Sequence, residues 1–305
     1  MTRIGWADLP GAVRAAVEDI VGAPVVSAVS QAGGFTPGTA DRVRTAGGRR
    51  AFVKAVSRTL NVDSAAMHRR EARITAALPP DAPAPRLLGS YDDGEWVALV
   101  LTDVAGRHPR TPWESGELDA VLHMLDTMAT ALTPSPVPGL PTVAAYLGPD
   151  LAAWNRIAAD PPADLHPWAA GRLDALRAQA DRALAALTGD TLAHLDVRAD
   201  NLLVRPDGDV TLVDWPHACT GPPWLDRVLL LVDVCLHGGH DVTALLRRFA
   251  ADTDADEAAL RAVLAALAGY FVDVSRRPPP PGIPTVRAFQ RAHGDGLISW
   301  LVREC

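Results

Sequence analysis

The stretch that decides the fold is HLDVRADNLLVRPDGDVTLVDW, residues 194–215. Two short apolar runs within it, 202–205 and 209–213, lie on either side of a turn that contains Asp-Gly at 207–208. An Asp-Gly pair between two such runs is a strong signal for a β-hairpin. The residues that flank this predicted hairpin are polar and acidic, so its open end is the first place to look for a functional site.

A turn centred on Asp207 and Gly208 would fix the register of this hairpin. In that register Asn201 lies opposite Asp214, and opposed residues have Cα atoms about 4.5–5.5 Å apart. A carboxamide oxygen and a carboxylate are hard ligands of the kind that Mg²⁺ takes together with substrate phosphates. Asp196, five residues before Asn201, is expected to face the same space. Taken singly, each residue is more often a turn cap; the combination indicates a site.

The only lysine of the chain, Lys54, lies in a second short stretch, AFVKAV at 51–56; the other 28 basic residues are arginines. A composition typical of GC-rich coding disfavours lysine, so a single survivor is compatible with chance. The alternation nevertheless places Phe52, Lys54 and Val56 on one strand face. An inward-facing ammonium needs an anionic partner, and a compact, flexible point charge suits a phosphate. The alternative is a lone charge on an edge strand.

Composition favours a soluble globular protein. The chain has 305 residues, of which 48% are hydrophobic and 21% charged, enough for one large core or two moderate ones. No uninterrupted apolar run reaches membrane-spanning length, and the first residues lack a signal-peptide core. Cys219, Cys235 and Cys305 show no metal-ligand spacing and are expected to be reduced thiols. We therefore expect a cytoplasmic monomer without a membrane partner.

The charge is unevenly distributed along the chain. Residues 1–100 carry 12 basic and 10 acidic side chains, a balance of +2, whereas residues 101–305 carry 17 and 26, a balance of −9. A strongly acidic second half argues against a nucleic-acid partner. It favours a cationic ligand, with plain solubility as the alternative explanation.

Hydrophobic periodicity divides the chain into two lobes. Residues 1–101 combine a helix ending near Gly22, five strands and a second helix capped by Asp63 or Ser64, with an apolar stripe of Met67, Ile74 and Leu78. The strands are expected at 25–32, 39–46, 50–57, 86–91 and 96–101. Residues 102–113 interrupt the pattern and are expected to link the lobes. Residues 114–305 are mainly helical.

The segment HLDVRADN matches the pattern H-x-D-x-x-x-x-N of the catalytic loop of kinases. Together with VDWPHACTGPPWLD, it resembles the aminoglycoside phosphotransferase family, the antibiotic-kinase branch of the protein-kinase-like fold. QAGGFTPGTADRV at 31–43 resembles the nucleotide loop of that family, and LVLTDVAG at 99–106 resembles its hinge. The resemblance covers about residues 25–230. It implies a bilobal α+β fold with a small β-rich N-lobe and a larger, mainly helical C-lobe.

The resemblance implies binding of ATP mainly by the N-lobe. Lys54 would contact the α- and β-phosphates and would be held by Glu71. Gly34 would lie in the nucleotide loop. The carbonyl of Thr102 and the N–H of Val104 would meet the edge of the adenine.

The resemblance also implies the chemistry of transfer. Asp196 would orient the acceptor hydroxyl and take its proton, and Arg198 would stabilise charge on the transferring phosphoryl group. Asn201 and Asp214 would hold Mg²⁺. Structural residues would include His194, which braces the loop, and Asp226, its buried anchor. Phosphoryl transfer depends mostly on positioning and charge neutralisation, so these groups suffice.

Departures from protein kinases indicate the kind of acceptor. Trp215 replaces the Phe-Gly that follows the metal-binding aspartate, and no Ala-Pro-Glu segment or long activation loop is present. These differences argue against a protein substrate. The nucleotide loop also lacks G-x-G-x-x-G spacing, which leaves its phosphate contacts undefined.

We therefore predict an ATP- and Mg²⁺-dependent phosphotransferase acting on a hydroxyl of a small molecule, with a cationic, aminoglycoside-like antibiotic favoured. Two alternatives are a metabolic kinase for an amino alcohol, sugar or natural product, and a non-catalytic nucleotide-binding scaffold. The intact set of Lys54, Asp196, Asn201 and Asp214 argues against the scaffold.

Overall fold

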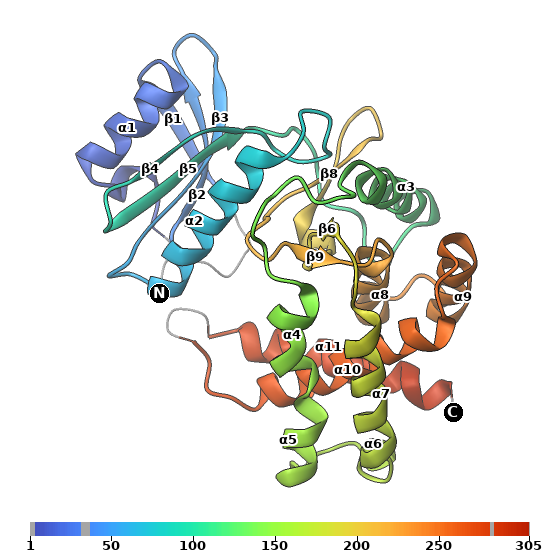
Figure 1. Ribbon diagram of the computed structural model, residues 1–305. Coiled ribbons are helices and arrows are strands. Elements are labelled where there is room, and N and C mark those ends of the chain that lie inside the picture. The colour runs from blue at the N-terminus through green and yellow to red at the C-terminus, as the bar shows by residue number, and fades with distance from the viewer. Residues whose placement is uncertain (1–3, 32–36, 281–283, 305) are drawn as a thin grey trace. The chain divides into compact units, whose positions relative to one another are not determined.

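The computed structural model describes residues 4–31, 37–280 and 284–304 and divides into two compact units. The first unit comprises residues up to 108, 200–217 and the ends of the segment 280–284, and the second comprises 109–199, 218–279 and the chain from 285 onward. The first unit contains a small antiparallel sheet, and the second is mainly helical (Figure 1). This confirms the expected α+β class. The lobe boundaries at 101 and 114 stay predictions.

The sheet of the first unit has five antiparallel strands in the order β1-β2-β3-β5-β4. Each strand expected from the sequence is present within two residues of its expected ends. The bounds are β1 Val25–Ser30, β2 Thr39–Thr45, β3 Arg50–Ser57, β4 Leu87–Asp92 and β5 Trp96–Thr102. β3 lies between β2 and β5, so the alternative that Lys54 is a lone charge on an edge strand is wrong.

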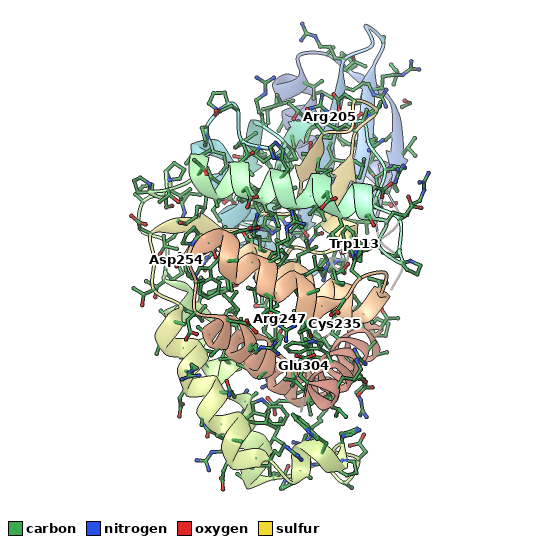
Figure 2. The ribbon with its side chains drawn as sticks, turned by 90° about the vertical axis from the view of Figure 1, so that its right-hand side faces the viewer. Trp113, Arg205, Cys235, Arg247, Asp254 and Glu304 are labelled. Carbon is green, nitrogen blue, oxygen red and sulfur yellow. The ribbon has the colours of Figure 1, made fainter. Side chains whose placement is uncertain are left out.

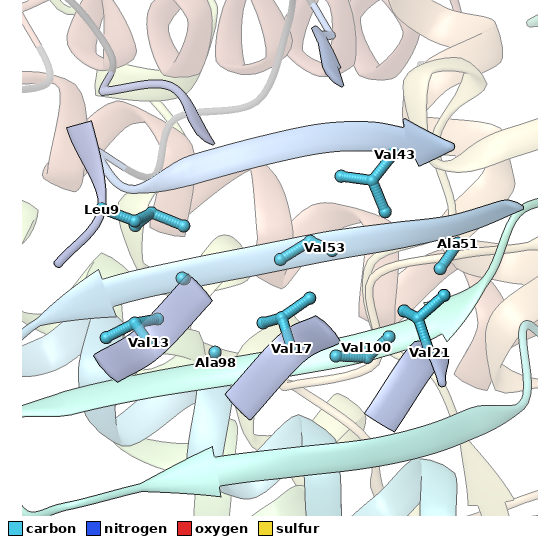
Figure 3. Close-up of a cluster of buried hydrophobic side chains, with 10 residues drawn as sticks. Leu9, Val13, Val17, Val21, Val43, Ala51, Val53, Ala98 and Val100 are labelled. Atoms are coloured by element: carbon cyan, nitrogen blue, oxygen red, sulfur yellow. The ribbon is translucent and has the colours of Figure 1, made fainter. Parts of the chain in front are cut away.

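Helix α1 (Gly11–Val21) covers one face of this sheet. Val13 and Val17 pack against Val53 and Val100 in a buried cluster (Figure 3). Gly22 ends the helix with φ of 84°, a left-handed conformation that favours glycine. The predicted end of this helix is therefore confirmed. Because alternate residues of β3 face opposite sides, Lys54 points away from α1.

Helix α2 (Val62–Ala77) packs on the face of the sheet that carries Phe52 and Val56. Its cap is Asn61, whose side chain accepts a hydrogen bond from the backbone N–H of Ser64 at 2.8 Å. The expected caps, Asp63 and Ser64, are therefore wrong, because the helix already begins at Val62 and both residues lie in its first turn.

The buried face of α2 also differs from the expected stripe. Met67 is 37% exposed, whereas His68, Glu71 and Ile74 are buried. The helix therefore presents Glu71 to the sheet.

The hairpin of the central stretch consists of β7 (Leu202–Val204) and β8 (Val210–Leu212). Its register pairs Leu202 with Leu212, so the turn has three residues and the register predicted for a two-residue turn is wrong by one position. The third turn residue, Gly208, has φ of 92°. A three-residue hairpin turn ending in a left-handed residue is the next common type after the two-residue turns. The Asp-Gly signal thus located the hairpin but not its register.

The second unit contains nine helices, α3–α11, among its described residues, and a two-stranded sheet of β6 and β9. Helix α10 lies at its centre, where Trp154 donates from Nε1 to the carbonyl of Ala265 at 2.8 Å. The bounds are α3 Ser115–Ala131, α4 Val143–Leu151, α5 Ala153–Ala159, α6 Pro167–Ala170, α7 Leu173–Ala186, β6 Thr191–Ala193, β9 Cys219–Gly221, α8 Leu225–His237, α9 Val242–Thr253, α10 Glu257–Ser275 and α11 Val286–Arg303.

Side chains tie the C-terminal helices together in this unit. Glu304, just after α11, accepts from Nη1 of Arg261 on α10 at 2.6 Å. Cys235 lies on α8, and burial raises the pKa of its thiol to about 12; Figure 2 labels both Cys235 and Glu304. Cys219 and Cys235 are free thiols, as expected, and Cys305 lies outside the described residues.

Helix α10 is also long and apolar enough to cross a membrane by length and composition. Of the most apolar stretch of this helix, 67% is buried inside the protein. A core helix of a water-soluble protein has the same properties, so this helix is weak evidence for a membrane span.

Candidate active site

Lys54 is held in the first unit by two carboxylates. Its Nζ lies 2.8 and 2.9 Å from the two carboxylate oxygens of Glu71 and 2.7 Å from Oδ1 of Asp214. The side chain of Lys54 is 14% exposed and that of Glu71 is 1% exposed. The inward-facing ammonium therefore has the anionic partners that its position on β3 requires.

Burial and charge act in opposite directions on this group. Burial alone would lower the pKa of Lys54, but the carboxylates of Asp214 and Glu71 outweigh burial and raise that pKa above its ordinary value. Burial raises the pKa of Glu71, and the ammonium of Lys54 opposes this rise. Lys54 is therefore a permanent cation at neutral pH.

Backbone geometry directs Asp214 toward Lys54. Asp214 follows β8 and has φ of 70°, a left-handed conformation that Asp tolerates at a cost of about 1–3 kcal/mol. The next residue, Trp215, is fully buried and donates from its backbone N–H to Oε1 of Glu71 at 3.4 Å. Its indole N–H donates to the carbonyl of Leu212 at 2.9 Å. This buried anchor holds the backbone at Asp214 in place.

Asn201 lies in the short 3-10 turn Ala199–Asn201, directly before β7. Its carbonyl accepts from the backbone N–H of Val213 at 2.9 Å, so Val213 and not Asp214 lies opposite Asn201. The predicted direct opposition of Asn201 and Asp214 is therefore wrong. Both residues still lie at the open end of the hairpin.

The donor set at this end of the hairpin fits a hard cation. Asp214 offers a carboxylate that is 41% exposed, and Asn201 offers a carboxamide. Among the residues that the structure describes, no group of three or more His, Cys, Asp or Glu side chains could hold a metal. An ion bound by Asn201 and Asp214 would therefore need further oxygens, as Mg²⁺ takes from phosphates and water.

The expected hinge follows β5. The backbone N–H of Thr102 donates to the carbonyl of Arg86 at 2.9 Å, and the carbonyl of Val104 accepts from Nη2 of Arg42 at 2.9 Å. Between them, the carboxylate of Asp103 forms ion pairs with Arg42 at 3.2 Å and Arg50 at 2.9 Å. Neither arginine was predicted from the sequence, because the shared partner Asp103 is more than fifty residues away along the chain.

The catalytic-loop segment of the second unit is anchored by Asp226 on α8. The carboxylate of Asp226 accepts from the backbone N–H groups of His194 at 2.8 Å and Leu195 at 3.0 Å. Burial raises the pKa of Asp226 to about 6, although these two donors oppose the rise. His194 is fully buried, and its Nδ1 accepts from the backbone N–H of Asp196 at 3.2 Å.

Asp196 and Arg198 lie together in the same segment. Nε of Arg198 is 3.5 Å from Oδ1 of Asp196, and the two side chains are 17% and 25% exposed. Leu195, just before Asp196, has φ of 69°. Such strain concentrates at functional sites, where it aims a side chain.

The predicted site residues thus fall into two groups. Lys54, Glu71 and Asp214 meet in the first unit, which also contains the hinge and Asn201. Asp196 and Arg198 meet in the second unit. Gly34 lies outside the described residues.

A lysine of an antiparallel sheet, Lys54, binds the helix carboxylate Glu71, and Asp226 anchors a segment of the pattern H-x-D-x-x-x-x-N. Together these features define a kinase-like enzyme of the bilobal α+β class. A family model described as the phosphotransferase enzyme family matches residues 38–267. The chain belongs to this family, and it is a phosphotransferase with an alcohol group as acceptor.

Three solved structures with a similar fold are distant from this chain in sequence. An aminoglycoside phosphotransferase from Alicyclobacillus acidocaldarius is 18% identical and covers 97% of this chain and 96% of its own (TM-score 0.53). A thermostable mutant of aminoglycoside phosphotransferase APH(4)-Ia, in complex with AMP-PNP and hygromycin B, is 15% identical, with coverages of 95% and 98% (TM-score 0.60). Choline kinase LicA from Streptococcus pneumoniae is 16% identical, with coverages of 94% and 98% (TM-score 0.57). No curated protein matches the chain.

Proposed function

We propose that this enzyme transfers the γ-phosphoryl group of ATP to a hydroxyl of a cationic small molecule in the cytoplasm, acting as a monomer. The observation that carries the proposal is the contact of Lys54 with both Glu71 and Asp214. It joins a phosphate-binding cation to a carboxylate suited to a metal. The complexes of the structurally similar APH(4)-Ia with AMP-PNP and with ADP support the nucleotide.

The nucleotide is held mainly by the first unit in this proposal. Lys54 exchanges Asp214 for oxygens of the α- and β-phosphates and keeps Glu71 as its fixed partner. Thr102 and Val104 meet the adenine, and the ion pairs of Asp103 keep that segment in place.

Asn201 and Asp214 would hold Mg²⁺, which neutralises phosphate charge when it is bound. The acceptor oxygen attacks the γ-phosphorus while the bond to the β,γ-bridging oxygen breaks, and ADP carries away the bonding electron pair. Asp196 orients the acceptor hydroxyl and takes its proton. Arg198 stabilises the negative charge on the transferring group.

A cationic acceptor fits the acidic charge balance of the second part of the chain. Residues 101–305 carry a balance of −9. Burial raises the pKa of Tyr270 on α10 to about 12; the carboxylates of Asp150 and Asp196 add to this rise, and the guanidinium groups of Arg277 and Arg287 oppose it. Charges of both signs thus lie near Tyr270, and it is the acidic excess of residues 101–305 that favours a cationic acceptor. An aminoglycoside-like antibiotic offers several ammonium groups to such a surface.

A second candidate is a metabolic kinase for a monocationic amino alcohol. The similarity of the fold to a choline kinase favours this alternative. Both candidates share the chemistry of transfer and differ in the charge and size of the acceptor.

The test is transfer of labelled γ-phosphate from ATP, with Mg²⁺, by the purified chain to a panel of aminoglycosides, amino alcohols and neutral sugars. Label in a hydroxyl of a polycationic acceptor is expected, and the Asp196→Asn variant is the negative control. Growth of cells with and without the expressed gene on the same antibiotics gives an independent reading. Transfer to neutral acceptors alone would exclude the cationic substrate class, and no transfer to any acceptor would overturn the proposed function.

A further inference from the structure

The arginine of the catalytic-loop segment lies over an aromatic ring of the C-terminal helix. The guanidinium carbon of Arg198 is 5.1 Å from the ring centroid of Phe289, on the first turn of α11. The Arg198 side chain is only 17% exposed, and a cation–π contact contributes more when it is shielded from water. The flexible arginine is thus restrained on one side by a ring and on another by Asp196.

Phe289 belongs to a set of three neighbouring rings, Phe271, Phe289 and His293, which we call the aromatic platform. The rings of Phe289 and His293, one helical turn apart, have centroids 4.3 Å apart. His293 is 1% exposed and stacks on Phe271 of α10 with centroids 5.1 Å apart and an interplanar angle of 25°. Nδ1 of His293 lies 3.0 Å from the carbonyl oxygen of Phe289.

Two glycines of α11 fix the position of the platform. A Cβ atom at Gly294 would lie 3.3 Å from Cβ of Phe271 on α10, and one at Gly296 would lie 3.2 Å from the carbonyl oxygen of Cys235 on α8. Both distances are tighter than ordinary contacts. Helix α11 therefore approaches both neighbours closely, and the backbone that carries Phe289 has little room to shift.

We propose that Phe289 is a positioning residue, which holds the guanidinium of Arg198 in the orientation needed for phosphoryl transfer. The inference rests on the proposed role of Arg198. Without the ring, the long side chain would gain rotamer freedom, and its charge would be misplaced in the transition state. Helix α11 thereby contributes to catalysis although it carries no residue of the recognisable motifs.

The kinetic test compares Phe289→Leu, which removes the π face but keeps apolar volume, with Phe289→Tyr, which keeps the π face. Phe289→Leu should lower kcat about five- to thirtyfold, the range of a shielded cation–π contact. The KM for ATP should stay within about twofold, because the nucleotide residues belong to the first unit. Phe289→Tyr should retain kcat within about twofold.

A double-mutant cycle then links the effect to Arg198. In an Arg198→Gln background, Phe289→Leu should change kcat less than about twofold. Phe249→Leu is the matched control, since the ring of Phe249 lies 5.2 Å from Arg227 in the same unit. This control should lower stability but leave kcat close to wild type. If Phe289→Leu lowered kcat as much in the Arg198→Gln background as in the wild type, the proposal would be overturned. A wild-type kcat in the single variant Phe289→Leu would overturn it as well.

Amide hydrogen exchange decides the inference independently of activity. Residues 195–199 should exchange at least about fivefold faster in Phe289→Leu than in Phe289→Tyr, and Arg198→Gln should abolish this difference. Equal exchange in the two variants would overturn the inference. A wild-type chain that transfers phosphate to no acceptor would instead overturn the proposed function, and exchange would still decide the role of Phe289.

Discussion

Nζ of Lys54 lies 2.7 Å from Oδ1 of Asp214, although 160 residues separate them along the chain. The same ammonium contacts both oxygens of Glu71, so three acceptors surround one cation. Glu71 is buried, whereas the side chain of Asp214 is 41% exposed. The two carboxylates therefore differ in accessibility: Glu71 is a buried partner, whereas Asp214 is open to solvent, as the proposed exchange with nucleotide and metal requires.

This difference predicts the effect of Lys54→Arg. The planar guanidinium is bulkier than an ammonium and cannot place one charge between Glu71 and Asp214 in the same geometry. Turnover should fall at least tenfold, which is about 1.4 kcal/mol in the barrier. Steady-state kinetics with saturating acceptor measures the loss. An exposed arginine changed in the opposite sense, Arg58→Lys, is the control, and wild-type turnover of Lys54→Arg would show that Lys54 does not bind the phosphates.

A second prediction separates proton transfer from nucleotide binding. Asp196→Asn keeps the shape of the side chain but removes the base, so kcat should drop by about two orders of magnitude or more. ATP affinity in the presence of Mg²⁺ should change little in this variant. Asp214→Asn should instead weaken the Mg²⁺-dependent part of nucleotide affinity, as measured by calorimetry. Equal loss of nucleotide affinity in both variants with unchanged kcat would contradict the assigned roles.

The fold was predictable from the sequence because the deciding signals are local, whereas the roles assigned to the site residues stay predictions. Strand alternation placed Lys54 on an inner face, and an Asp-Gly turn located the hairpin that carries Asp214. Its register was predicted one position off, because turn length depends on whether Gly208 is the second or the third turn residue. The left-handed backbone of Asp214 compensates by redirecting the carboxylate, and no sequence pattern revealed that.

Some contacts between distant segments left no signal in the sequence. Arg42 binds the carbonyl of Val104, and Phe289 lies under Arg198, at separations of 62 and 91 residues. Neither contact has a periodic or motif-like signature, because both depend on the packing of whole elements. One signal was present but ambiguous: the helical spacing of Phe289 and His293 places them on one face, which is equally typical of an ordinary core.

The buried carboxyl of Asp226 predicts a pH dependence of stability. Its pKa is raised to about 6 in the folded chain from about 3.9 in the unfolded chain. The folded state thus binds this proton more tightly, so the contribution to the free energy of unfolding is fully present below pH 4. It is lost as pH rises to 6, by on the order of 3 kcal/mol, and changes little above that. Urea unfolding of wild type and Asp226→Asn between pH 4 and pH 7 measures this contribution.

The variant serves as the reference because other titrating groups cancel in the comparison. The stability of wild type relative to Asp226→Asn should fall between pH 4 and pH 6 and then level off. Parallel pH profiles for the two proteins would show that the carboxyl of Asp226 titrates normally.

The last prediction concerns the acceptor and follows from the balance of −9 in residues 101–305, against +2 before them. If the acceptor is polycationic, exposed carboxylates attract it through the solvent. Salt screens this attraction beyond about 10 Å at an ionic strength of 0.1 M. The KM for a polycationic acceptor should therefore rise steeply between low and moderate ionic strength. The KM for ATP should rise less, because Lys54 and the metal hold its phosphates at close range. Initial rates at constant pH, with potassium chloride as the only variable, measure both constants.

A neutral sugar that is also accepted would be the control, with a KM independent of salt. Equal salt dependence of the two KM values would mean that the acidic surface serves solubility alone, and it would remove the electrostatic argument for a cationic acceptor while leaving the chemistry of Asp196 and Lys54 untouched.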